Sequence, residues 1–406
     1  MLDLLPARLR HLPARRFPVR QLSTGICLLL AVLTVLPAPA LACPFCSAPS
    51  LTLSEQITQA DAVILTSWVE GEKATENSAG STRVKVVEVL KTVDPSVKKG
   101  DLITLPRYRA AKPGELFALM GTKAATFDWG TPLEVDRAAW EYIAKAPGPK
   151  DPPGKRLAYY MGYLEFPNAM VATDAYGEFA NAPYQDITPL ADKMPRERLR
   201  QWINSSETAV TRLGLYGLML GLCGTEEDAA LMEERILDKT EDFRLGIDGV
   251  MAGYLLLTRD KGLAVLDSAK LKNQDVPFSE TYAAMQALRF MWTYGDDAIS
   301  KERLRQSMQI LLDRPELADL VIADLARWKD WSVQDRLMKL YGEGEYDIPS
   351  IRRAIVRYML VCTKDVPQGE NAEIPASAKK AQAHLDQLRK QDPKTVKEAE
   401  RFFFIR

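Results

Sequence analysis

Apolar residues recur at helical spacing through most of the second half of the chain. Over 317–328, and again over 351–362, they fall on one face of a helix, which is typical of amphipathic helices with one buried side. Thr225 and Asp228 have the spacing of a capping box at a helix start. The pattern predicts successive helices over residues 155–365. The residues that carry it are Leu317, Leu320, Val321, Leu325, Trp328, Ile351, Ile355, Met359 and Cys362.

The region before these helices has a different pattern. Short runs rich in β-branched residues are separated by turn residues such as Gly100 and Gly114, which is typical of strands joined by turns. No helical segment connects one run to the next. We therefore expect a small antiparallel β-barrel or sandwich over residues 43–146. The predicted strands are 62–69, 83–90, 102–106 and 116–120.

Prolines and glycines mark the boundary between the two regions. Residues 147–154 contain four prolines and two glycines, so we interpret them as a linker. The tail, 366–406, is polar until its last helix, and we expect the aromatics of 402–405 to dock back on the helices. The predicted fold class is α+β and multidomain, with a β-rich domain followed by an α-solenoid over 155–365.

The N-terminus has the pattern of an export signal. Five arginines precede an apolar run over 26–36, which is followed by Ala40-Leu41-Ala42. The last three residues fit a signal-peptidase site, and the run is shorter than the roughly 20 residues of a membrane-spanning helix. We expect residues 1–42 to be a signal peptide, and the protein to be exported to the periplasm or the extracellular space.

The predicted mature chain starts with a cysteine pair, Cys43 and Cys46. The interpretation that we favour is a local disulfide that forms after export and closes the N-terminus against the barrel. Lipidation of Cys43 is an alternative, because a cysteine directly after a cleavage site resembles a lipoprotein junction. A redox-active dithiol is a third possibility. No strand can precede the pair in the mature chain, which disfavours a thioredoxin-like role.

Composition excludes several kinds of chemistry. The chain has 53 basic and 54 acidic side chains and only two histidines, His11 and His384. His11 lies in the predicted signal peptide, so Ser-His-Asp, Cys-His and multi-histidine metal sites are excluded. The near-neutral charge gives no indication of a nucleic-acid partner. We therefore predict no catalytic residue, no metal and no cofactor.

Other chemical groups have ordinary structural interpretations. We expect Cys223 and Cys362 to be buried free thiols. The acidic clusters at 226–228, 233–234 and 343–347 are expected to be solvated helix faces or a loop. The tryptophans could line a groove, but at helical spacing we expect them in the core. They are Trp292, Trp328 and Trp331.

Two resemblances to known folds add to these patterns. The helix, Pro167 turn and helix over 156–180 resemble a HEAT repeat, with matching residues at Leu164, Val171, Asp174 and Ala175. This resemblance implies a stack of helix pairs with an extended surface for other proteins.

Residues 43–125 resemble the OB-type barrel of netrin-like and metalloprotease-inhibitor modules. The shared features are the opening cysteine, the strands at 61–64 and 84–90, and Gly100-Asp101 before another strand. The chain has Cys-x-x-Cys where the inhibitors have Cys-x-Cys. The overall layout is similar to uncharacterised secreted bacterial families, which imply no activity.

These observations together favour a non-enzymatic protein. We expect an exported protein-binding or assembly protein that uses its helical surface, with a possible lipid anchor at Cys43. The alternatives are a periplasmic thiol-disulfide oxidoreductase that uses Cys43 and Cys46, and a netrin-like protease-inhibitor module.

Overall fold

The structure is a computed structural model of the 406-residue chain. It describes residues 43–45, 51–239, 243–368 and 373–401. These residues belong to one compact unit, Ala42–Arg406. The predicted signal peptide lies outside them, so its cleavage stays a prediction. No helix in the described part of the chain is long and apolar enough to cross a membrane.

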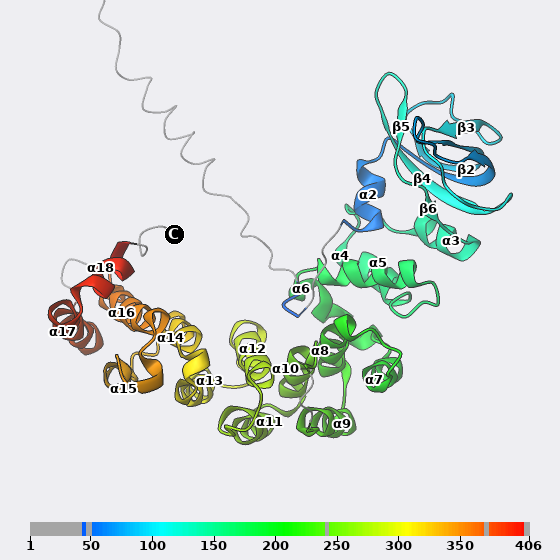
Figure 1. Cartoon of the computed structure of the whole chain (residues 1–406). Helices are drawn as coiled ribbons and strands as arrows, with labels where there is room; N and C mark the ends of the chain where they lie inside the picture. The colour runs from blue at the N-terminus through cyan, green and yellow to red at the C-terminus, as the bar shows by residue number, and fades with distance from the viewer. Residues whose placement is uncertain (1–42, 46–50, 240–242, 369–372, 402–406) are drawn as a thin grey trace, which may run out of the picture. The chain divides into compact units, whose positions relative to one another are not determined.

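An antiparallel sheet forms the first part of this unit (Figure 1). The strand order is β3-β2-β1-β4-β5, and β6 pairs with β4. Antiparallel pairing is therefore confirmed, but among the described strands β3 and β5 are edges and the sheet is open. The strands are β1 (Ala62–Glu72), β2 (Ser81–Thr92), β3 (Leu102–Leu105), β4 (Leu116–Lys123), β5 (Phe127–Trp129) and β6 (Leu133–Glu134).

The central strand β1 is buried on both faces. Side chains alternate between the faces of a strand, and Val63 and Leu65 belong to the large core that continues into the helices. Ala62 and Ile64 point into a smaller cluster on the other face, together with Trp129. The sheet is thus packed on the helical region through one face and has a core of its own on the other.

Two helices flank the sheet in the sequence. α2 (Leu53–Gln59) starts with a capping box in which the Thr52 amide donates to Glu55 Oε2 at 2.9 Å. α3 (Arg137–Lys145) is capped by Asp136, whose carboxylate accepts from the Ala139 amide at 2.7 Å.

The rest of the described chain is helical, as predicted. The predicted capping box at Thr225 is confirmed, because its amide donates to Asp228 Oδ2 at 2.8 Å. The elements are α4 (Pro153–Met161), α5 (Ala169–Ala180), α6 (Tyr184–Ile187), η1 (Thr188–Lys193), α7 (Arg196–Asn204), η2 (Val210–Arg212), α8 (Leu213–Cys223), α9 (Glu226–Leu237), α10 (Ile247–Thr258), α11 (Asp260–Leu266), η3 (Asp267–Leu271), α12 (Phe278–Tyr294), α13 (Lys301–Ile310), η4 (Leu311–Asp313), η5 (Pro315–Leu317), α14 (Ala318–Arg327), α15 (Gln334–Leu340), η6 (Gly344–Tyr346), α16 (Pro349–Lys364), α17 (Ala376–Gln391) and α18 (Pro393–Arg401).

The boundaries differ from the predictions in two places. α4 begins at Pro153, inside the predicted linker 147–154, because a proline in the first helical turn needs no N–H acceptor. α17 was expected to be solvated, but its Leu385 and Leu388 are buried and it packs on α16. The predicted docking of residues 402–405 lies outside the described residues.

The helices α8 and α10 are in direct backbone contact. A Cβ atom at Gly253 of α10 would lie 2.0 Å from the carbonyl oxygen of Gly217, and one at Gly249 would lie 2.2 Å from that of Gly214. Glycine is therefore required where these helices touch. α10 also packs on α12, so the three helices form one continuous layer (Figure 1).

Candidate functional site

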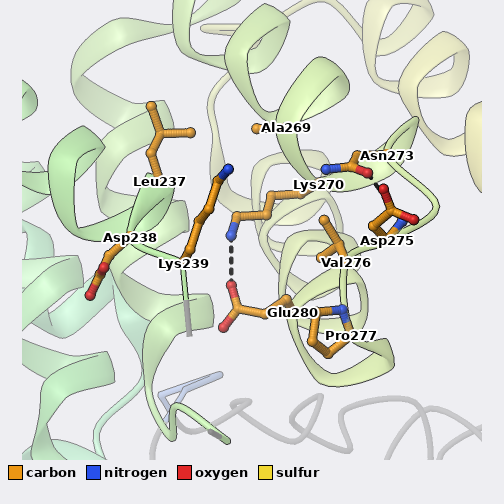
Figure 2. Close-up of a pocket in the computed structure, with 10 residues that line it drawn as sticks. All are labelled: Leu237, Asp238, Lys239, Ala269, Lys270, Asn273, Asp275, Val276, Pro277 and Glu280. Atoms are coloured by element: carbon orange, nitrogen blue, oxygen red, sulfur yellow. Dashed lines mark hydrogen bonds and ion pairs between the residues drawn. The ribbon is translucent and has the colours of Figure 1, made fainter. Parts of the chain in front are cut away.

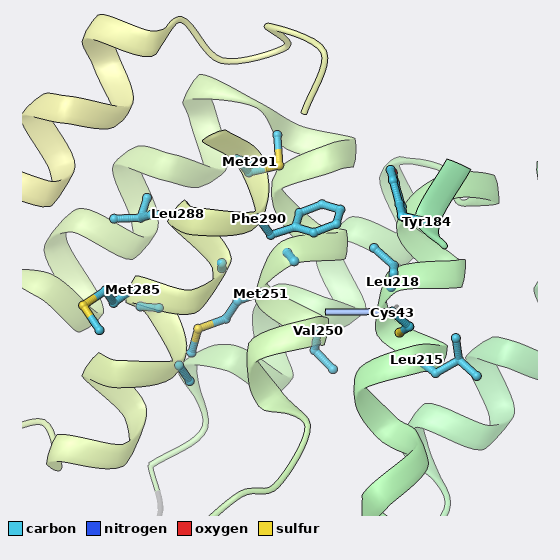
Figure 3. Packing of buried hydrophobic residues seen from close by; sticks show 14 of the residues in the cluster. Cys43, Tyr184, Leu215, Leu218, Val250, Met251, Met285, Leu288, Phe290 and Met291 are labelled. Carbon is cyan, nitrogen blue, oxygen red and sulfur yellow. The ribbon is translucent and has the colours of Figure 1, made fainter. Parts of the chain in front are cut away.

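The cysteine that opens the predicted mature chain lies in the helical core, not against the sheet. Cys43 is 3% exposed, and Figure 3 shows it beside Leu215 and Leu218 of α8. The ring of Phe45 lies 5.2 Å from that of Phe290 on α12. The expectation that this segment closes against the barrel is therefore wrong. Apolar contacts with α8 and α12 hold residues 43–45 instead.

The chemical state of this cysteine pair stays a prediction. Cys46 lies outside the described residues, so neither a Cys43–Cys46 disulfide nor lipidation of Cys43 is tested. The free thiols in the described chain are Cys223 and Cys362; Cys362 is buried as predicted, whereas Cys223 is only partly buried. Burial raises the pKa of each to about 11, so both are protonated and poor nucleophiles at neutral pH.

The acidic clusters serve structural roles where the structure describes them. The buried Asp228 accepts from Arg200 Nε at 2.7 Å. Burial acts to raise the pKa of Asp228, but hydrogen bonds from Arg200 and Thr225 keep this pKa below its ordinary value. No group of three or more metal-binding side chains is present among the described residues.

The tryptophans also stabilise the helical core, as expected. The rings of Trp292 and Trp328 stack with centroids 4.3 Å apart and an interplanar angle of 5°. Trp331 donates its indole N–H to Asp365 at 2.7 Å. These contacts join α12, α14 and α16, and they account for the tryptophans without a ligand.

A cavity of about 660 Å³ between α9, η3 and α12 is lined by a buried lysine and a buried glutamate, together with other residues (Figure 2). Lys270 and Glu280 are 6% and 2% exposed. The Lys270 ammonium donates to Glu280 Oε2 at 2.8 Å. The remaining lining residues are Leu237, Asp238, Lys239, Ala269, Asn273, Asp275, Val276 and Pro277.

Local structure places these charged groups in the cavity wall. Lys270 belongs to η3, a π-helical turn in which the Lys272 amide donates to the Asp267 carbonyl at 2.9 Å. Such turns are rare and are frequent at functional sites. Arg244, from the segment before α10, donates to both oxygens of Glu280, with 2.9 Å from its Nε. Glu280 therefore receives two cations from two different elements.

Electrostatics keep Glu280 ionised. Burial acts to raise its pKa, but the hydrogen bonds from Arg244 and Lys270 keep the pKa below its ordinary value. Burial and the nearby Arg244 charge lower the pKa of Arg235. Among the described residues, the buried part of the site thus pairs the Glu280 carboxylate with the cations of Lys270 and Arg244.

Large exposed apolar side chains lie close to cavity residues in the sequence. Phe243 is 71% exposed and Phe278 is 49% exposed, while Leu237 and Leu245 are each 41% exposed. Leu237 lines the cavity, Phe278 follows the lining residue Pro277, and Phe243 and Leu245 flank Arg244, which pairs with Glu280. Large exposed apolar side chains near a cavity are typical of interaction sites.

A second cleft, of about 960 Å³, lies between the sheet and the first helices. Asp174 of α5 lines it and accepts from the Leu53 amide at 2.6 Å and from the Tyr142 hydroxyl. Burial raises the pKa of Asp174 to about 6. Arg212, which also lines the cleft, pairs with Glu165 at 2.9 Å. These polar groups are used to join α2, α3 and α5, so we interpret the cleft as a structural junction.

The sequence interpretation did not include Lys270 or Glu280. A single lysine or glutamate in a helical region is usually solvated, and neither belongs to a motif. Lys270 stands between the apolar residues Ala269 and Leu271, but Asp267, Ser268 and Lys272 lie close to it, so the sequence gives no clear signal that it is buried.

Comparisons with known proteins give no identification. No family model matches the sequence, and no curated protein and no solved structure is significantly similar to it. Function is therefore argued from the site alone.

Proposed function

We propose that this chain is an exported, non-enzymatic protein that binds or assembles with another protein through its helical surface. The observation that carries the proposal is the α9–α12 cavity, where buried charges occur together with large exposed apolar side chains on neighbouring residues of the sequence. Interfaces of this kind combine apolar anchors with a few fixed polar groups. The two most exposed anchors are Phe243 and Phe278.

The helix contacts support a HEAT-like solenoid as the scaffold of this surface. α8 packs on α10 and α10 on α12, and further along the chain α14 packs on α16 and α16 on α18. Each of these pairs omits the helix between its members, as expected when alternate helices form one layer of a stack. Solenoids of this kind present extended surfaces to other proteins. For the sheet, we keep an OB-like barrel as the proposed relationship.

The burial of Cys43 bears on the role of the N-terminus. A cysteine with 3% exposure is poorly accessible to a substrate disulfide, and its contacts with α8 favour an anchoring role. We therefore propose a Cys43–Cys46 disulfide as a clasp, in preference to a redox centre, a lipidated residue or an inhibitory terminus. Intact-mass analysis of the exported protein distinguishes a loss of two hydrogens from an added lipid.

Site-specific photo-crosslinking of the full chain in the cells that export it tests the proposed function. A photoreactive phenylalanine analogue replaces Phe243, and in a matched control it replaces Leu320, which is 37% exposed on α14. We expect a discrete adduct with a second protein from position 243 and none from position 320. The same diffuse adducts from both positions, or none from either, would contradict the proposal.

A further inference from the structure

Arg314 is a buried arginine that contacts residues around the α9–α12 cavity without lining the cavity itself. It lies between η4 and η5 and is 4% exposed. Its carboxylate partner is Glu316, at 3.2 Å, and the side chain of Glu316 is 43% exposed. Removal of a charge from water is costly unless the charge is paired. The other groups that this guanidinium contacts must therefore help to compensate for its burial.

The guanidinium of Arg314 holds the loop 272–277, which joins η3 to α12. It donates to three backbone carbonyls of this loop, those of Asn273 at 2.7 Å, Val276 at 3.2 Å and Gln274 at 3.4 Å. Gln274 stands 40 positions before Arg314 in the sequence. Carbonyl oxygens after the last turn of a helix carry partial negative charge, which suits a cation. Arg314 thus ties the end of the η3 turn to the helices α13 and α14.

The loop has few internal contacts that could fix it instead. Among the described residues, the Val276 amide donates to the Asn273 carbonyl at 3.4 Å, and the Asp275 amide donates to the Asn273 side chain at 3.1 Å. Residues 272–275 are exposed, so apolar packing contributes little to their position. A guanidinium presents five N–H donors in a fixed fork, and we infer that this fork is the main anchor of the loop.

The same loop forms one wall of the α9–α12 cavity (Figure 2). The loop residues that line the cavity are Asn273, Asp275, Val276 and Pro277. Arg314 also supports the buried lysine of the cavity through a neighbouring hydroxyl. It donates to Thr281 Oγ1 at 3.1 Å, and this hydroxyl donates to the Lys270 carbonyl at 3.2 Å. One side chain from outside the cavity therefore contacts both the loop and the backbone support of Lys270.

We propose that Arg314 is a positioning residue of the proposed binding site. It fixes the loop 272–277 as a wall of the α9–α12 cavity. The shape of the cavity then depends on α13 and α14, the helices on either side of Arg314, although neither helix contributes a residue to the cavity lining. The effect of Arg314 on partner binding rests on the proposed function, whereas its effect on the loop does not.

Hydrogen exchange of the full exported chain, measured by mass spectrometry, tests the effect on the loop. Arg314→Lys keeps the positive charge but loses the planar fork that reaches several carbonyls at once. We expect peptides that cover 272–277 to exchange at least about tenfold faster in this variant, since hydrogen bonds from a charged donor are strong. Peptides from α16 should exchange at the wild-type rate, because the loss of one anchor opens the structure locally.

Arg305→Lys is the matched control. Arg305 also donates to a backbone carbonyl, that of Trp328, at 3.0 Å from its Nε, and in the described chain its hydrogen bonds do not reach the loop. This variant should leave the exchange of 272–277 unchanged. Thr281→Val keeps the shape of the side chain and removes the hydroxyl that Arg314 contacts. If Arg314→Lys does not fold, Thr281→Val should still speed the exchange of the loop by at least about twofold.

The crosslink from position 243 measures the effect on the partner. A loop that is held in its bound conformation lowers the entropic cost of binding. Arg314→Lys should therefore lower the yield of the discrete adduct by at least about fivefold, and Arg305→Lys should leave the yield unchanged.

Three results would overturn the inference. They are wild-type exchange of 272–277 in Arg314→Lys, an equal acceleration of exchange in the loop and in α16, and a wild-type adduct yield from a variant whose loop exchanges faster. The second result would mean that Arg314 contributes only general stability. A wild-type chain that gives no adduct would contradict the proposed function, and the exchange of the loop would still decide whether Arg314 fixes it.

Discussion

A single methyl group at the contact between α8 and α10 should destabilise the protein. In Gly253→Ala the new Cβ would lie 2.0 Å from the Gly217 carbonyl oxygen and 2.9 Å from Met232 Cε. The helices must separate, which costs about 3 kcal/mol by analogy with overpacked cores. Higher helix propensity of alanine offsets about 1 kcal/mol. The expected net loss of unfolding free energy is about 2 kcal/mol.

A matched glycine elsewhere in the chain provides the control. Gly177 lies inside α5, and a Cβ there would meet Thr52 Cγ2 at 3.5 Å, an ordinary contact. Gly177→Ala should therefore stabilise the protein by about 1 kcal/mol through helix propensity. Urea unfolding followed by circular dichroism compares both variants with the wild type. A Gly253→Ala protein as stable as the wild type would refute the backbone contact between the two helices.

Three further changes test the account at other positions. Because burial raises the pKa of Asp174 to about 6, its ionised form is disfavoured in the folded state. The unfolding free energy of the wild type, relative to that of Asp174→Asn, should thus fall by on the order of 2 kcal/mol as the pH rises from about 4 to 6.5 in urea titrations. A difference that does not change with pH would contradict this. Glu280→Gln leaves Lys270 and Arg244 without their carboxylate and should lower the unfolding free energy by about 3 kcal/mol in the same assay. A loss below about 1 kcal/mol would indicate that these three side chains are not buried. Phe290→Ala should lower the unfolding free energy by about 3–5 kcal/mol and increase the rate of protease cleavage near Cys43. An unchanged cleavage rate would indicate that packing on α12 does not hold residues 43–45 in place.

Helices and strands could be predicted from the sequence because local residue patterns largely determine them. The β-branched run at residues 62–69 and the capping box at Thr225 predicted a strand and a helix start that the structure contains. The open edges of the sheet were not predictable, since closure depends on how far a sheet curls and not on any one strand. The start of α4 at Pro153 was missed because the proline and glycine content of residues 147–154 was interpreted as a linker throughout.

The candidate site was largely invisible in the sequence. The cysteine pair was the one motif in the sequence that indicated chemistry. The position of Cys43 beside α8 and α12, however, depends on contacts with residues more than 160 positions away. Lys270 and Glu280 belong to no motif, and Arg244 lies on a third segment. Helix packing brings these three side chains together, and no short pattern in a single sequence predicts such packing.

The central claim is that the α9–α12 cavity is where a partner protein binds. The most direct test compares the crosslinked adducts from position 243 and from position 320 of the full chain. The account predicts a discrete adduct with a second protein from position 243 and none from position 320. The same diffuse adducts from both positions, or no adduct from either, would contradict it.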